Sequence, residues 1–481
     1  MADLDLVIRN AHVATSGDEF SADIGIKDGR IVMLADAINV AAREEIDAAG
    51  RIVTPGGIDG HCHIDQPTTD GSVCADDFES ATRSAACGGT TTVIPFALQM
   101  KGMSLREAVA DYHRRADGHA LIDYAFHLIV TDPTEQLLGQ DLPALIRDGY
   151  TSFKIYMTYD DMKLNDAQIL DLLSVARREQ ALVMIHAENS EVIAWLTRQL
   201  ERCGNIAPRY HANSRPKAVE REATHRAITL AEVVDTPILI VHVSGRDAVE
   251  QIRWAQGRGM RIYAETCPQY LFLTEDDLAK PGFEGAKCLC SPPPRDAANQ
   301  QVIWDGLING TFQVFSSDHA PTRFDDAKGK KLHGEDAAFQ YIPNGVPGLE
   351  TRLALLYSAG VLEGRISVQE FVALTSTNVA RMYGLYPRKG TIGIGADADL
   401  VVWDERDVII ANDKLHHNVD YTPYEGIHLK AWPGLTLSRG VVVWDGIAAA
   451  GSPGRGQFLA CVPPTPARPA AGNGAVRSFS G

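Results

Sequence analysis

Eight short runs of β-branched and apolar residues recur along the middle of the chain, and this recurrence limits the possible folds more than any other feature. The runs occupy residues 51–58, 90–96, 124–130, 150–157, 181–187, 237–243, 261–266 and 311–317. Segments with helical periodicity lie between most of them, for example residues 76–89, 142–149, 165–180, 217–234 and 246–259. Strands and helices that alternate eight times predict an α/β fold with a TIM-like (β/α)8 barrel, and a doubly wound open sheet is the competing topology.

The two ends of the chain have a different pattern. Residues 1–52 alternate in a strand-like way, and residues 390–446 do the same. We therefore expect a smaller β-sandwich domain built from residues 1–55 and 386–455, beside a catalytic barrel of residues 56–385. Residues 456–481 are rich in Pro, Ala and Gly and are expected to form a loosely ordered tail.

The composition limits the partners and the location. The 481 residues carry a formal net charge of -17, which argues against a general affinity for nucleic acid or for anionic membranes. No stretch approaches the roughly 20 consecutive apolar residues of a transmembrane helix, and the N-terminus lacks the basic region of a signal peptide, so we expect a cytoplasmic protein. The eight cysteines include no CxxC pair and are expected to be free, mostly buried thiols.

Candidate metal ligands fall at the ends of the predicted strands. His61 and His63 end the first strand, Lys154 lies in the fourth, His186 ends the fifth, His242 ends the sixth and Asp318 ends the eighth. A single histidine at a strand end is more often a packed core residue, and an Asp before His is often a cap or turn residue. In a barrel, however, all six side chains would meet at the mouth formed by the C-terminal strand ends, and this joint placement predicts a metal site.

Charge counting bears on the role of Lys154. Two divalent cations held by four neutral imidazoles and one carboxylate, with a bridging hydroxide, would leave an excess of about two positive charges in a poorly solvated pocket. A lysine amine that has lost its proton can react with carbon dioxide, and the resulting carbamate would supply an anionic bridge. An ordinary ion pair is the alternative for this lysine.

Seven segments, taken in order, resemble those of the dihydropyrimidinases and D-hydantoinases, which are cyclic amidohydrolases of the amidohydrolase superfamily. The segments are PGGIDGHCHID, FKIYMTY, HAEN, HVSG, CSPPPR, SSDHAP and IPNGVPGLE, and the resemblance extends from about residue 4 to about residue 460. It implies two divalent metal ions per subunit, usually Zn2+, and a homotetramer. One ion would be bound by His61, His63 and Asp318 and the other by His186 and His242, with N6-carboxylated Lys154 bridging them.

The resemblance also implies a reaction, the opening of a small cyclic amide. Enzymes of this family convert dihydropyrimidines or 5-substituted hydantoins to N-carbamoyl amino acids, and a metal-bridging hydroxide would attack the ring carbonyl. Asp318 would act as general base and then as general acid, and Tyr159 would donate a hydrogen bond to the oxyanion. Ser291 and Asn344 would contact the ring largely through backbone groups, although their neighbouring prolines and glycine also favour turns. A tyrosine such as Tyr159 is, taken alone, more often a packing residue.

The chain departs from the family pattern in three places. Gly60 and Cys62 replace a proline and a small residue, and we expect Cys62 to pack and not to bind metal. The segment after His63 is more polar than in hydantoinases for bulky aromatic substrates, and residues 318–344 form a slightly longer stretch.

Four rival functions stay open from the sequence. Allantoinase, dihydroorotase and cyclic imide hydrolase are the enzymatic alternatives. The alternative without catalysis is an assembly protein of the collapsin response mediator type, a class that has lost metal ligands. Every ligand position is filled in this chain.

Overall fold

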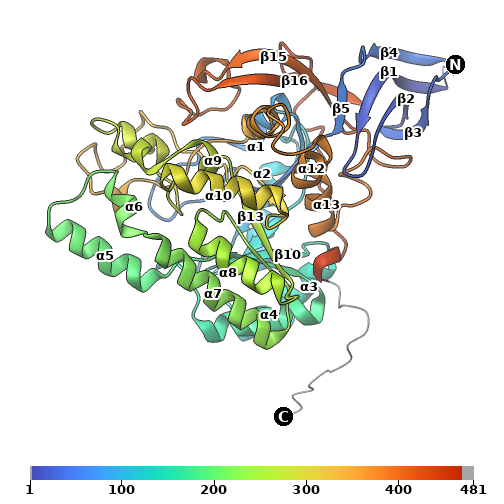
Figure 1. The fold of residues 1–481 in the computed structure, drawn as a ribbon. Helices are drawn as coiled ribbons and strands as arrows, with labels where there is room; N and C mark the ends of the chain where they lie inside the picture. The colour runs from blue at the N-terminus through green and yellow to red at the C-terminus, as the bar shows by residue number, and fades with distance from the viewer. Residues whose placement is uncertain (1–2, 468–481) are drawn as a thin grey trace.

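The computed structural model describes residues 3–467, with one sheet drawn from both ends of the chain beside a barrel sheet (Figure 1). The expected TIM-like barrel with a smaller β domain is confirmed. Residues 468–481, the greater part of the predicted tail, lie outside the described residues.

Eight parallel strands form the barrel and follow one another in chain order. They are β6 (Gly57–Cys62), β7 (Thr90–Leu98), β9 (His127–Ile129), β10 (Ser152–Tyr156), β11 (Leu182–His186), β12 (Ile238–Ile240), β13 (Ile262–Thr266) and β14 (Val314–Phe315). A short strand, β8 (Asp123–Tyr124), also pairs with β7. A parallel bridge joins Cys62 to His319, and the Ser317 N–H donates to Oδ1 of Asp59 at 3.2 Å. Because these contacts connect the last strand to the first, the sheet is closed and not an open doubly wound sheet.

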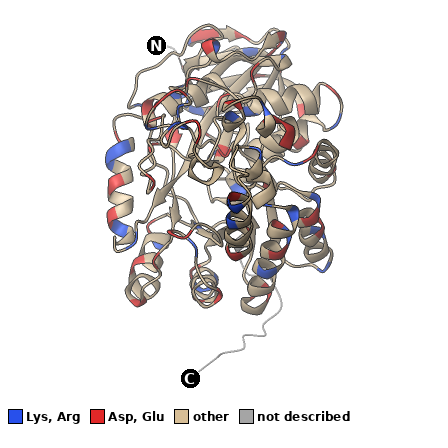
Figure 2. Cartoon of the chain, turned by 90° about the vertical axis from the view of Figure 1, so that its left-hand side faces the viewer, with Lys and Arg blue, Asp and Glu red and all other residues tan. Residues whose placement is uncertain are grey.

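Helices cover the outside of the barrel, and each predicted helical segment contains one. The helices are α1 (Phe78–Cys87), α2 (Leu105–Ala116), α3 (Leu142–Arg147), α4 (Asp166–Glu179), α5 (Ser190–Arg202), α6 (Tyr210–Ser214), α7 (Lys217–Val234), α8 (Arg246–Gly257), α9 (Gln269–Phe272), α10 (Ala297–Ile308), α11 (Arg352–Leu356), α12 (Val368–Val372) and α13 (Asn378–Met382). Local sequence fixes several starts, since the side chains of Asp77, Ser104 and Asn165 each accept a hydrogen bond from the backbone N–H three residues on. Acidic and basic residues are interspersed along the helices on the side of the molecule that faces the viewer in Figure 2.

The terminal sheet combines strands from both ends of the chain. Its strands are β1 (Leu4–Ala14), β2 (Glu19–Lys27), β3 (Arg30–Ala35), β4 (Ala42–Asp47), β5 (Ile52–Pro55), β15 (Leu400–Ile409), β16 (His428–Ser438) and β17 (Val441–Trp444). Strand β5 pairs with both β1 and β15 and so joins the two ends. The prediction of one strand over residues 51–58 is therefore wrong in one respect, because β5 belongs to this sheet and β6 to the barrel. Gly56 separates them, and a Cβ atom there would overlap Thr91.

The segment just after the terminal sheet returns to the barrel. The Tyr124 N–H donates to the carbonyl of Gln457 at 3.0 Å, and the Leu459 N–H donates to the carbonyl of Tyr124 at 2.7 Å. The ring of Phe458 packs edge-on against His113, with 4.7 Å between centroids. The first residues of the predicted tail are thus held by backbone hydrogen bonds and aromatic packing. The limits predicted for the domains stay a prediction.

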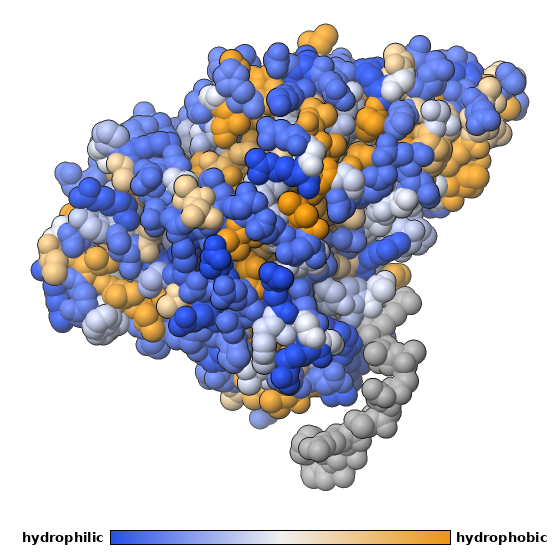
Figure 3. Space-filling view, viewed as in Figure 1, coloured by the Kyte–Doolittle hydropathy of each residue, from blue (hydrophilic) through white to orange (hydrophobic). Residues whose placement is uncertain are grey.

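The outer surface is mostly hydrophilic (Figure 3). Apolar side chains gather at its left edge, where α5 runs, and Trp195 on that helix is 55% exposed. Within residues 3–467, no helix has the length and apolar character needed to cross a membrane.

Candidate metal centre and active site

The carboxyl ends of the barrel strands bring the nine predicted site residues to one place. A cavity of about 670 Å³ opens there, and eight of the nine residues line it: His63, Lys154, Tyr159, His186, His242, Ser291, Asp318 and Asn344. His61 is fully buried and lies against the cavity floor, where it contacts Lys154 and Asp318. The structure therefore brings together, at one cavity, the side chains that were predicted to meet at the strand ends.

His61, His63 and Asp318 form one group of potential ligands. Oδ1 of Asp318 lies 3.2 Å from Nε2 of His61 and 3.6 Å from Nε2 of His63. One potential ligand atom from each of the three residues lies within 4.8 Å of the others, which is the spacing needed to surround a single cation. Nζ of Lys154 lies 2.8 Å from Nε2 of His61, at the edge of this group.

His186 and His242 form a second group beside the first. Nδ1 of His186 lies 2.9 Å from Nε2 of His242. The ring centroid of His242 lies 5.4 Å from that of His61, so the two groups share one floor. Nδ1 of His242 is buried and has no hydrogen-bond partner within the described part of the chain.

Burial sets the protonation of these groups. It lowers the pKa of His186, and it lowers the pKa values of His61 and His242 well below the ordinary value for histidine. Burial also lowers the pKa of Lys154 to about 8. Neutral imidazoles with free nitrogen lone pairs are the form that binds divalent metals. The site is thus electrostatically suited to cations and unsuited to protonated histidines.

Two carboxylates that orient the histidines were not singled out from the sequence. Oε1 of Glu265 lies 2.6 Å from Nδ1 of His61 and accepts the backbone N–H of His242 at 3.1 Å. Burial raises the pKa of Glu265 to about 8. Oε2 of Glu188 lies 2.8 Å from Nε2 of His186. Although burial alone would raise the pKa of Glu188, the guanidinium of Arg215 lowers it to about 2.

A signal for each carboxylate was present in the sequence. Glu265 lies at the C-terminal end of β13, so the strand-end rule that found the histidines also applies to it. Glu188 lies two residues after His186. A histidine that binds metal commonly has its second ring nitrogen paired with a carboxylate, and both positions fit that pattern.

Three predicted site residues have positive φ angles, which residues other than glycine rarely adopt. The φ angles of Tyr159, His242 and Asp318 are 67°, 39° and 48°. Such left-handed residues other than glycine cost free energy and concentrate at functional sites. In this chain the conformation places all three at the cavity wall.

The remaining predicted residues line the cavity above the histidines. Burial raises the pKa of Tyr159 to about 12, so its phenol keeps its proton near neutral pH. Oγ of Ser291 lies 3.1 Å from Nε2 of His211. Oδ1 of Asn344 is a buried acceptor without a hydrogen-bond partner among the described residues. A donor on a bound ligand would satisfy it.

Cys62 and Gly60 have packing roles. The Cys62 side chain is fully buried in the main hydrophobic core, and burial raises the pKa of its thiol well above the ordinary value. A Cβ atom on Gly60 would come 2.5 Å from Cε2 of Tyr383. A tyrosine ring therefore fills the space that a side chain at position 60 would need.

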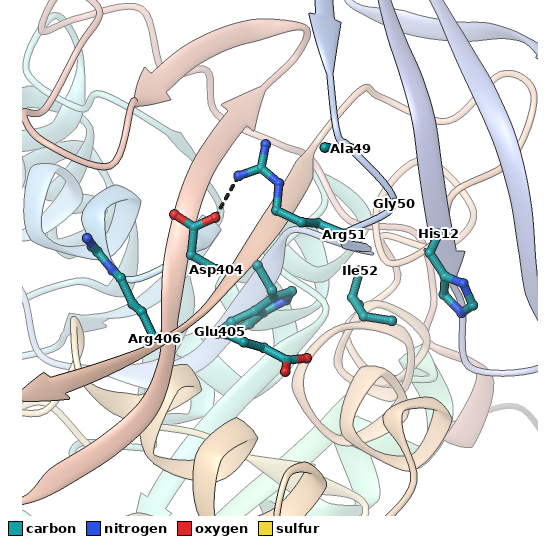
Figure 4. A pocket seen from close by; sticks show the side chains of 9 residues that line it. His12, Ala49, Gly50, Arg51, Ile52, Asp404, Glu405 and Arg406 are labelled. Carbon is teal, nitrogen blue, oxygen red and sulfur yellow. Dashed lines mark hydrogen bonds and ion pairs between the residues drawn. The ribbon is translucent and has the colours of Figure 1, made fainter.

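A separate hollow lies on the terminal sheet (Figure 4). It has a volume of about 620 Å³ and is lined by residues of β1, β5 and β15 and of the loop before β5. Arg51 spans part of it and donates to Oδ1 of Asp404 at 2.6 Å. None of the nine predicted site residues lines this hollow, so the candidate site is the barrel cavity.

Comparison with known proteins agrees with this geometry. A model of the amidohydrolase family matches residues 52–443. D-hydantoinases from Ralstonia pickettii and Rhizobium radiobacter are 45% and 44% identical to the chain, and each alignment covers 95% of this chain and 98% of the relative. The crystal structure of a dihydropyrimidinase from Brevibacillus agri NCHU1002 superposes with a TM-score of 0.93 at 42% identity and covers 96% of this chain and 99% of that one. The chain therefore belongs to the amidohydrolase family, within the group of the D-hydantoinases and dihydropyrimidinases.

Proposed function

We propose that the protein is a metal-dependent cyclic amidohydrolase that opens dihydropyrimidines or 5-substituted hydantoins to N-carbamoyl amino acids. The observation that carries the proposal is the convergence of four imidazoles, one lysine and one carboxylate on the floor of a single cavity. The full-length similarity to D-hydantoinases and to a dihydropyrimidinase supports the substrate class.

The residues present fit two divalent metal ions, for which we propose Zn2+. His61, His63 and Asp318 would hold one ion, and their ligand atoms lie within 4.8 Å of one another. His186 and His242 would hold the other through Nδ1 and Nε2, the ring nitrogens that face each other at 2.9 Å. Nitrogen-rich ligand sets of this kind suit zinc.

Lys154 would bridge the two ions after carboxylation. Its amine nitrogen would attack the carbon of carbon dioxide and form an N–C bond while the π electrons of one C=O bond move to oxygen. The nitrogen would then release a proton to water, which leaves a carbamate anion with two oxygen atoms. Burial supports this step, because it lowers the pKa of Lys154 to about 8 and so makes the neutral, nucleophilic amine accessible near neutral pH. The carbamate would also reduce the excess positive charge of two cations in a buried site.

When bound, the metal ions would supply Lewis-acid activation of water and of the ring carbonyl. Asp318 would accept the proton of the attacking water and return it to the leaving nitrogen. Burial alone would raise the pKa of Asp318, but the imidazoles of His61, His63 and His242 hold it well below its usual range, so the side chain is an ionised acceptor. Tyr159, whose phenol stays protonated, would donate a hydrogen bond to the oxyanion.

Ser291 and Asn344 would orient the ring, largely through their backbone groups. Both residues lie on turns that line the cavity. The unsatisfied Oδ1 of Asn344 would accept an additional hydrogen bond from a ring N–H.

A substrate panel tests the proposal. The panel contains dihydrouracil, dihydrothymine, alkyl and aryl hydantoins, allantoin, dihydroorotate and cyclic imides, and the opened acid is detected after incubation with protein produced with zinc and bicarbonate. Turnover of the dihydropyrimidines or hydantoins supports the proposal. Turnover confined to allantoin, dihydroorotate or the imides would replace it with one of those activities, and a metal-free protein without turnover would favour an assembly role.

The homotetramer is proposed on the resemblance alone. A cytoplasmic location stays a prediction from the sequence.

A further inference from the structure

A buried lysine outside the metal centre lies where three backbone carbonyl groups converge. The side chain of Lys330 is almost fully buried, and its Nζ donates to the carbonyl of Pro343 at 2.6 Å and to that of Gly345 at 2.7 Å. The carbonyl of Leu289 lies 3.5 Å from the same atom. Lys330 belongs to the stretch 318–344 that is longer than usual for the family.

The loop that carries Lys330 is itself fixed on several sides. The Lys330 N–H donates to the carbonyl of Arg323 at 2.8 Å. The carboxylate of Asp420 accepts the backbone N–H groups of Phe324 at 2.6 Å and of Asp325 at 2.8 Å. The amine therefore reaches its three carbonyl groups from an anchored loop.

The three carbonyl groups belong to the two turns that carry Ser291 and Asn344. The turns touch each other directly, because the Gly345 N–H donates to the carbonyl of Leu289 at 3.0 Å. Gly345 has a φ of 109°, and a Cβ atom there would come 2.5 Å from the carbonyl oxygen of Ala320. The backbone between Lys330 and the cavity thus has little freedom to relax.

Within the described part of the chain, the amine of Lys330 forms no ion pair with a carboxylate. Among residues 3–467, the recorded acceptors of Lys330 Nζ are all backbone carbonyl oxygens. Burial lowers the pKa of Lys330 to about 7. The amine donates to carbonyl groups that an apolar side chain of the same length would leave without this donor.

We infer that Lys330 is a positioning residue, which fixes the backbone of the Ser291 and Asn344 turns so that these turns recognise the ring of the substrate. The inference rests on the proposed function, in which the turns contact the ring through backbone groups. Substitution of the Ser291 or Asn344 side chain leaves that backbone in place. Lys330 donates to backbone carbonyl groups of both turns, so its substitution can change the position of that backbone.

The test compares Lys330→Met, which keeps the length of the side chain and removes its donors, with Lys328→Met, which removes an exposed lysine of the same loop. Steady-state kinetics are measured with a substrate that the wild-type protein opens. For Lys330→Met we expect KM to rise about tenfold while kcat stays within about threefold, since ring binding is weakened and the metal centre is untouched. Lys328→Met should leave both constants unchanged.

Hydrogen–deuterium exchange of the same proteins gives a second readout that needs no activity. Peptides that contain residues 285–292 and 340–347 should exchange faster in Lys330→Met than in Lys328→Met. If Lys330→Met is not recovered folded, Lys330→Gln, which keeps two N–H donors, replaces it and should give a smaller rise in KM.

The outcomes separate the inference from the function on which it rests. A wild-type protein that opens no compound of the panel overturns the proposed function. An active wild-type protein with an unchanged KM in the Lys330 variant, or with a loss confined to kcat, overturns the positioning role. Unchanged exchange in both peptides also overturns it.

Discussion

The amine of Lys154 is buried beside one imidazole and two aromatic rings. Its Nζ lies 2.8 Å from Nε2 of His61, 4.6 Å from the ring centroid of Phe96 and 4.9 Å from that of Tyr156. Aromatic faces attract a cation only weakly compared with water, so burial disfavours the charged form. These surroundings favour the neutral, reactive form of the Lys154 amine over the ammonium.

Carboxylation of Lys154 should depend on pH in a defined direction. The neutral amine is the reactive form, and burial lowers the pKa of Lys154 to about 8, so its fraction rises about tenfold per pH unit below 8 and levels off above. At a fixed concentration of dissolved carbon-13-labelled carbon dioxide, metal-free protein should therefore form carbamate faster at pH 8 than at pH 6. The carbamate signal in carbon-13 NMR measures the rate, and Lys154→Arg supplies the background. A rate that does not change over this interval contradicts the argument.

The phenol of Tyr159 is a second test at this scale. Removing one oxyanion donor costs roughly two to three powers of ten in kcat, and we expect that loss for Tyr159→Phe with ring opening as the assay. Metal content should not change, because Tyr159 is no proposed ligand. Tyr386→Phe, outside the cavity, is the matched control. A loss of less than about threefold in Tyr159→Phe would remove the proposed role.

At the scale of elements, a buried ion network joins the barrel to the terminal sheet. Nζ of Lys389 lies 2.7 Å from Oδ2 of Asp123, 3.0 Å from Oδ2 of Asp397 and 2.6 Å from Oδ2 of Asp399. Although burial alone would lower the pKa of Lys389, these carboxylates raise it, so the lysine stays charged. Asp123 belongs to β8 of the barrel sheet, and Asp399 immediately precedes β15 of the terminal sheet.

Loss of this lysine should destabilise the whole chain. Lys389→Met removes the cation that three buried carboxylates share and leaves Asp399 without its ion-pair partner, and we expect the free energy of unfolding to fall by about 3–5 kcal/mol. Chemical denaturation measures the change, with Lys414→Met, an exposed lysine, as control. If the two variants unfold at the same denaturant concentration, the network does not contribute as described.

Much of the element order follows from the sequence, and the exceptions have physical causes. Strand runs and helix periodicity predicted the eight barrel strands, because burial on both faces gives continuous apolar runs. The division of residues 51–58 between two sheets was missed, although Pro55, Gly56 and Gly57 interrupt the apolar run. The pairing of β5 with β1 and β15 involves distant segments, and the run itself does not reveal it. The meeting of the six candidate ligands at one mouth of the barrel was foreseen because strand ends converge.

Contacts made by loops could not be foreseen in the same way. Lys330 binds backbone carbonyl groups, and such acceptors leave no trace in residue identity. Glu265 lies near the C-terminal end of β13 and contacts His61, so the strand-end rule extends in this chain to a glutamate as well as to histidines.

At the scale of the whole molecule, closure of the barrel makes one site from distant parts of the chain. The proposed ligands extend from His61 to Asp318, and the bridge between Cys62 and His319 brings these two ends together. Metal ions bound only by the folded barrel would stabilise it by mass action. Removal of metal with a chelator should therefore lower Tm by several degrees, and zinc with bicarbonate should restore it, as measured by differential scanning calorimetry. An unchanged Tm would show that the ions are not coupled to the fold.

We propose that six side chains hold two metal ions and that one of the six, the carboxylated lysine, bridges the ions. Anomalous diffraction at the zinc edge, from crystals of protein produced with zinc and bicarbonate, tests it most directly. The account predicts two peaks, one beside His61, His63 and Asp318 and one beside His186 and His242, with carbamate density on Lys154 between them. An empty site with an unmodified Lys154 would contradict it.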